Sequence, residues 1–108
     1  MSPESLAIVL TTLGADADAG AIARALVEER LAACVNVLPP MMSTYRWKGV
    51  VEQEREQQLV IKTSGACVSA LQARLAELHP YELPEFVVLD ATGSAVYLRW
   101  VDENVETR

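Results

Sequence analysis

The residues best suited to chemistry lie in one run near the end of the chain, His79-Pro80-Tyr81-Glu82-Leu83-Pro84-Glu85. His79 is the only histidine of the chain, and the carboxylates of Glu82 and Glu85 follow it closely. Imidazole binds copper, zinc or nickel, whereas carboxylates alone suit harder cations. The two prolines would stiffen the loop. This run predicts a metal site, with the alternative that His79 ends a helix and hydrogen-bonds its last carbonyl groups.

Cys34 is the candidate fourth metal ligand, because a thiolate binds soft metals. Its alternative role is that of a small buried apolar side chain among alanines and valine. The only other cysteine is Cys67. Their spacing indicates neither a disulfide framework nor a zinc knuckle.

A second group of candidates lies in the middle of the chain. Tyr45 and Trp47 share one face of an extended segment, where they could form a platform for a ligand or the core of an interface. Glu56 and Lys62 share a strand face, and Lys62 could hold an anion. We interpret the charged run 52–56 as a solvated or cross-strand paired face.

Catalytic patterns are not evident. The chain has no convincing Ser/His/Asp set and no glycine-rich phosphate loop. Its carboxylates do not predict a pocket that would raise the pKa of one of them. We therefore expect a protein that is not an enzyme.

Periodic patterns place these residues on a simple series of elements. Short apolar runs predict strands at 6–10, 35–38 and 85–89, and a helical stripe follows Asp16 or Asp18 up to Ala33. A second helix starts near Ser64-Gly65 and must end before Pro80. A last helix follows Gly93-Ser94. Pro39-Pro40 should interrupt the second strand.

The segment from Val50 to Thr63 reads as one strand that returns from a tight turn at Lys48-Gly49. At a rise of ~3.3 Å per residue it would extend roughly 46 Å. A domain of this size has a radius of gyration of only ~13 Å. We therefore expect a hairpin that projects past its own domain and is covered by another copy of the chain.

Composition sets the broad class. A hydrophobic content of 51% in 108 residues is high for a small monomer and fits an oligomer. The net charge of -6 argues against nucleic acid and anionic membranes as partners. No signal peptide or membrane-spanning run is visible, so a cytoplasmic location is expected.

The predicted order, β-α-β-β-α-β with an additional C-terminal helix, is that of an α+β, ferredoxin-like split βαβ fold. Both main helices should cover one face of an antiparallel sheet. We expect residues 1–108 to form a single domain of this kind with a long projecting hairpin.

Several motifs are shared with a known family. They are Leu31-Ala32-Ala33-Cys34-Val35-Asn36-Val37, Ser43-x-Tyr45-x-Trp47-x-Gly49, Glu56, Lys62-Thr63 and the run from His79 to Glu85. With these motifs the chain resembles the divalent-cation tolerance family, often called CutA, over nearly its whole length. The resemblance implies a ferredoxin-like homotrimer whose hairpins pair with neighbouring subunits. It also implies similarity to the trimeric PII signalling proteins, which bind small ligands between subunits.

Three functional hypotheses follow. The first is a trimeric metal-response protein that binds divalent cations such as copper through His79, Glu82, Glu85 and Cys34. The second is a PII-like module that binds a small anionic ligand in an intersubunit cleft lined by Tyr45, Trp47, Glu56 and Lys62. The third is a stable trimeric scaffold that anchors another protein.

Overall fold

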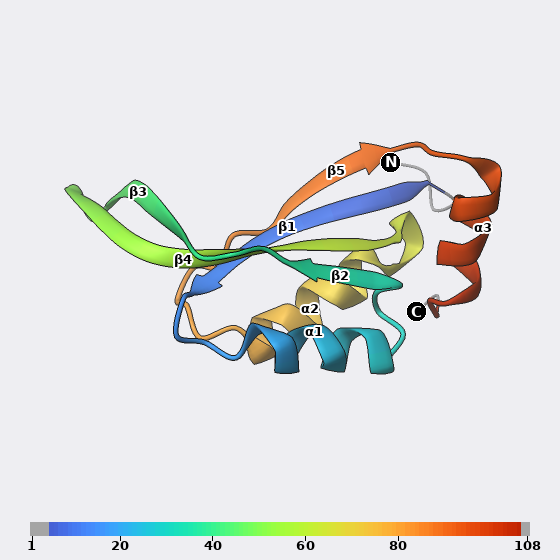
Figure 1. Cartoon of the computed structure of the whole chain (residues 1–108), viewed down its shortest axis with the longest axis horizontal. Coiled ribbons are helices and arrows are strands. Elements are labelled where there is room, and N and C mark those ends of the chain that lie inside the picture. The colour runs from blue at the N-terminus through green and yellow to red at the C-terminus, as the bar shows by residue number, and fades with distance from the viewer. Residues whose placement is uncertain (1–4, 107–108) are drawn as a thin grey trace.

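The computed structural model describes residues 5–106, and its elements follow the predicted order (Figure 1). The elements are β1 (Leu6–Gly14), α1 (Ala19–Glu28), β2 (Cys34–Val37), β3 (Met41–Trp47), β4 (Val50–Ser64), α2 (Val68–Leu78), β5 (Val87–Ala91) and α3 (Ala95–Glu103). A short 3₁₀ turn, η1 (Gly65–Cys67), leads into α2. The predicted α+β, ferredoxin-like arrangement with an additional C-terminal helix is confirmed.

The antiparallel sheet is organised around β4, which is fifteen residues long. The strand order is β2-β4-β1-β5, and β3 also pairs with β4. The half of β4 near Ser64 pairs with β1 and β2, whereas the half near Val50 pairs with β3 alone. This second half forms, with β3, the projecting arm at the left of Figure 1. The predicted long hairpin is therefore present, and the longest dimension of the molecule is 44 Å.

The arm closes in a two-residue turn. Lys48 and Gly49 both have positive φ angles, 49° and 82°. Two consecutive positive φ angles define the type I′ turn, whose twist matches that of antiparallel strands. The tight turn predicted at Lys48-Gly49 is confirmed.

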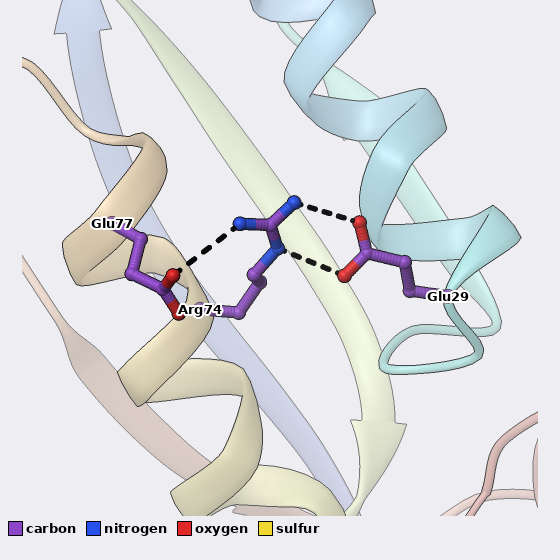
Figure 2. A network of polar contacts seen from close by, with 3 residues as sticks. All are labelled: Glu29, Arg74 and Glu77. Carbon is purple, nitrogen blue, oxygen red and sulfur yellow. Dashed lines mark hydrogen bonds and ion pairs between the residues drawn. The ribbon is translucent and has the colours of Figure 1, made fainter.

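Helices α1 and α2 lie beneath one face of the sheet (Figure 1). Asp18 caps α1, because its Oδ1 accepts a hydrogen bond of 3.0 Å from the N–H of Ala21. Arg74 of α2 donates two hydrogen bonds to the carboxylate of Glu29 and also lies near Glu77 (Figure 2). This bidentate contact joins the end of α1 to the middle of α2.

Several boundaries differ from the predictions. The first strand continues to Gly14, four residues past its predicted end, and α2 begins at Val68, after a 3₁₀ turn. The first helix ends at Glu28, well before Ala33, because Arg30 has a φ of 60° and reverses the chain. Cys34 consequently opens β2 and does not end a helix. The last strand begins at Val87, two residues later than predicted, because the loop after Pro84 continues to that point.

The two faces of the sheet differ in how they are covered. On the face toward α1 and α2, the side chains of Val9, Leu13, Leu59 and Ile61 are completely buried. On the opposite face, which we call the open face, Leu10 lies beside Val60 and Val87 in the strand register. Val87 and Leu89 on this face are 43% and 47% exposed. An apolar sheet face is therefore left without a covering layer within the described chain.

The remaining helix, α3, packs at the end of the sheet opposite the arm (Figure 1). Its first turn is capped by the hydroxyl of Ser94, which accepts from the N–H of Tyr97. None of the helices between residues 5 and 106 has both the length and the apolar character needed to traverse a lipid bilayer.

The core contains one polar defect. Thr11 is fully buried, and its hydroxyl has no hydrogen-bond partner among residues 5–106. A buried hydroxyl without a partner costs about 1–3 kcal/mol relative to water. Valine has the same shape without this cost.

We expect Thr11→Val to raise the free energy of unfolding by about 1 kcal/mol. The matched control is Thr11→Ser, which keeps the hydroxyl and loses a methyl group, and which should lower stability. Urea unfolding at one fixed protein concentration measures both variants. A Thr11→Val protein less stable than the wild type would show that the hydroxyl has a partner in solution.

Candidate functional site

A groove of about 940 Å³ lies between the arm and the segment that leads into β5. One wall is made by β3 and β4, and the other by residues 80–87. Its lining is aromatic and acidic, with Tyr45, Trp47, Tyr81 and Phe86 among the side chains. Five carboxylates line it, from Glu52, Glu54, Glu56, Glu82 and Glu85. Arg46 is the only basic residue in this lining, so the groove has a formal charge of -4.

Strand alternation places three of these carboxylates on one face. Residues 52, 54 and 56 of β4 are two apart, and successive side chains of a strand point to opposite faces. In the register of the arm, Tyr45 lies opposite Glu52, and Ser43 lies opposite Glu54. The aromatic ring and the carboxylates therefore occupy the same face of the ribbon.

Glu56 lies at the root of the arm, where β4 pairs with both Gly14 of β1 and Met41 of β3. Its side chain is only 7% exposed. The hydroxyl of Tyr81 donates a hydrogen bond of 2.8 Å to its Oε2. A buried carboxylate needs such a donor, because the charge would otherwise lose its hydration without compensation.

Both tyrosines beside the carboxylates are held in the protonated state. Burial first, and then the hydrogen bond to Glu56, raise the pKa of Tyr81 well above its ordinary value of 10.0. Desolvation and the neighbouring Glu54 also raise the pKa of Tyr45. The phenol of Tyr81 donates its hydrogen bond to Glu56, and the phenol of Tyr45 lies beside Glu54.

The structure places His79 where its ring is fully engaged. Its Nε2 lies 2.6 Å from the carbonyl oxygen of Thr12, and its Nδ1 accepts from the N–H of Tyr81 at 3.1 Å. The backbone N–H of His79 bonds to the carbonyl of Leu75 and ends α2. The alternative that His79 ends the helix is thus correct for its backbone, but its ring binds β1 instead of the helix.

The predicted metal set is not brought together within one chain. Glu82 is exposed and lies 3.9 Å from Lys48, and Glu85 accepts a hydrogen bond from Gln58. Cys34 lies on β2, opposite Lys62 in the register. Within residues 5–106, no three His, Cys, Asp or Glu side chains are close enough to hold a metal ion. Within one chain these residues stay apart, because the ring of His79 turns inward while the two glutamates face the groove.

The predicted cleft residues are only partly brought together. Tyr45, Trp47 and Glu56 line the groove, but Lys62 does not. The ammonium of Lys62 donates a hydrogen bond of 2.8 Å to Oδ1 of Asn36 on β2. The predicted cation for an anionic ligand is therefore absent from the groove of the described chain.

Sequence reasoning missed the carboxylates of Glu52 and Glu54 and the phenol of Tyr81. The alternating glutamates were a visible signal, but a solvated strand face shows the same pattern. Tyr81 and Glu56 are 25 residues apart, and no local pattern joins them.

The fold and this groove define a ferredoxin-like α+β domain with a projecting two-stranded arm. A family model described as "CutA1 divalent ion tolerance protein" matches residues 7–104. The chain belongs to this family, as its motifs predicted.

Individual relatives agree with this assignment. The divalent-cation tolerance protein CutA of Thermus thermophilus is 47% identical over 98 residues, which cover 90% of this chain and 95% of that protein. The mouse protein CutA is 41% identical over 106 residues, and the chain spans 60% of its length. A solved structure described as a PII-like protein CutA, from Nostoc sp. PCC 7120, superimposes with a TM-score of 0.88. It shares 41% identity, and the match covers 94% of this chain and 99% of that one.

The raised pKa of Tyr81 gives a test by alkaline titration. A raised pKa means that the folded chain retains this proton, so its contribution to stability is present below the ordinary value of 10.0 and is lost as the pH rises through the folded value. Of the three tyrosines, we expect Tyr81 to ionise last in the ultraviolet titration, after Tyr45, whose pKa is also raised, and we expect Tyr81→Phe to remove that last step. A last step that is unchanged in Tyr81→Phe would contradict the Tyr81–Glu56 contact.

Proposed function

We propose that the chain acts in divalent-cation tolerance as a self-assembling binding protein without catalytic turnover. The cation, copper among those it would bind, is held as cargo on the carboxylates of the groove. The observation that carries the proposal is the charge of this groove, which is lined by five carboxylates and one arginine, with Lys48 beside Glu82 as the neighbouring cation. A surplus of negative charge gathered in one groove attracts cations.

Copper prefers imidazole or thiolate ligands, and the described chain offers neither in the groove. Both ring nitrogens of His79 are engaged in hydrogen bonds. Cys34 is half-buried and lies on another part of the sheet. The residues of one chain therefore do not fit a resident copper ion. Carboxylate oxygens coordinate many divalent cations, and a second copy of the chain would supply the remaining ligands.

Self-assembly is supported by two features of the sheet. The open face presents Leu10, Val60, Val87 and Leu89 without a covering layer, and such apolar surfaces mark contact sites. The outer edges of β3 and β5 are unpaired among the described strands, and they lie on opposite sides of the sheet. Pairing of one edge with the other is a head-to-tail contact, which closes into a ring when the rotation allows. We propose that this ring is a homotrimer, as the family resemblance implies.

The cytoplasm is the proposed location. Both cysteines, Cys34 and Cys67, are free thiols, which suits a reducing compartment.

A small anionic ligand is the second candidate, supported by a structural relative described as PII-like. Lys62 and Asn36, joined on the sheet, are the groups available to such a ligand. The acidic groove repels an anion, so this ligand would bind away from Glu52 and Glu54. Lys62→Ala should abolish its binding while leaving the groove intact.

We expect Leu89→Glu to dissociate the assembly, because it places a charge on the open face. Sedimentation velocity should show a shift from three times the chain mass of 11.8 kDa toward the single chain. Ala73→Glu, which adds the same charge to the exposed side of α2, is the matched control and should sediment like the wild type. A Leu89→Glu protein with unchanged mass would contradict the role of the open face.

The cation site is tested by calorimetric titration with Cu²⁺ and Zn²⁺. We expect the double variant Glu52→Gln/Glu54→Gln to lose about tenfold in affinity, because it removes two charges and keeps the side-chain shape. Cys34→Ser is the control and should bind like the wild type. Loss of binding in Cys34→Ser, with the groove variant unaffected, would move the site to the thiol.

A further inference from the structure

The ring of His79 joins three parts of the molecule although its side chain is only 7% exposed. Its Nε2 contacts the carbonyl oxygen of Thr12, on the strand β1. Its Nδ1 contacts the backbone N–H of Tyr81, in the wall of the groove. The residue itself follows directly after α2. The imidazole therefore connects the sheet, the helix end and the groove wall.

The two partners determine the state of the ring. A carbonyl oxygen only accepts hydrogen bonds, so Nε2 must carry a hydrogen. A backbone N–H only donates, so Nδ1 must present its lone pair. The ring is therefore a neutral imidazole in a single tautomer, with no nitrogen left for a metal ion.

From this ring the contacts continue into the groove. The rings of His79 and Tyr81 lie with their centroids 4.9 Å apart, and the phenol of Tyr81 bonds to Glu56. His79 thus contacts both the backbone and the ring of Tyr81, whose hydroxyl bonds to the carboxylate of Glu56. Three hydrogen bonds therefore link Thr12, His79, Tyr81 and Glu56, and each of them joins one donor to one acceptor.

We propose that His79 is a positioning residue of the groove, which acts through Tyr81 to fix the carboxylate of Glu56, and that it is not a metal ligand. This explains why a histidine next to several carboxylates does not form a metal site. The effect on cation binding rests on the proposed function of the groove. The tautomer and the hold on Tyr81 do not depend on that function.

The tautomer is tested directly on the wild-type protein. Because His79 is the only histidine, a long-range ¹H–¹⁵N spectrum contains one pair of imidazole nitrogens. We expect a protonated Nε2 and a bare Nδ1, both unchanged when Zn²⁺ is added. The opposite tautomer, or a Zn²⁺-dependent shift of either nitrogen, would overturn the proposal.

Two amide variants separate positioning from metal ligation. In His79→Asn the side-chain oxygen replaces the Nδ1 acceptor and can still hold the N–H of Tyr81. In His79→Gln the side-chain amide replaces the Nε2 donor to Thr12, but the acceptor for Tyr81 is lost. A residue that only fills space would make the two variants alike.

We expect His79→Gln to lower the alkaline midpoint of Tyr81 by about one pH unit, and His79→Asn to keep it near that of the wild type. Zn²⁺ affinity should fall about tenfold in His79→Gln and much less in His79→Asn. Equal loss of Zn²⁺ in both variants, with the tyrosine titration unchanged, would make His79 a ligand. If the wild type binds no Zn²⁺, the proposed function fails, whereas the tyrosine titration and the tautomer still decide the role of His79.

Discussion

β4 is longer than the body of the domain that it crosses, and this mismatch determines where the candidate ligands lie. Its fifteen residues pair with β1 and β2 over one half and only with β3 over the other. A two-stranded ribbon alone is at best marginally stable in water. The arm therefore depends on contacts at its root, on the groove wall and, in the proposed assembly, on a neighbouring copy that would cover it.

Polar contacts on both faces of the sheet hold the root of the arm. The side-chain amide of Gln57 donates to the carbonyl groups of Gly14 and Ala17, which ties β4 to the loop before α1. On the other face, Glu56 accepts from Tyr81. Alternation along β4 sends these neighbours to opposite sides of the sheet. The carboxylate of Glu56 is stabilised there by the hydrogen bond from Tyr81, and it takes part in none of the ion pairs among residues 5–106.

Assembly and cation binding are coupled in this account. Covering an acidic groove with a second copy removes carboxylates from water, which is costly unless opposite charge accompanies them. A divalent cation bound there, as proposed, would supply that charge, so its binding would favour the assembled state and assembly would favour the cation. The apolar open face provides the attractive contribution that does not depend on the cation.

The sequence predicted the features that arise from local patterns. The helix cap, which was predicted at Asp16 or Asp18 and lies at Asp18, the turn at Lys48-Gly49 and the projecting hairpin follow from residue preferences and strand alternation. The end of α1 was not predictable, because Arg30 adopts a positive φ that sequence patterns associate with glycine or asparagine. The engagement of His79 was also hidden, since its partner is a backbone carbonyl 67 residues away, which any residue could provide.

The central claim is that the arm and the sheet edges of one chain are completed by another copy. Amide hydrogen exchange of the wild-type protein tests it most directly, at the alternate N–H groups of β3 and β5 that point away from their partner strands. The account predicts slow exchange at these amides, because a neighbouring strand accepts their hydrogen bonds. Exchange as fast as that of open strand edges, in a protein with the mass of a single chain, would contradict it.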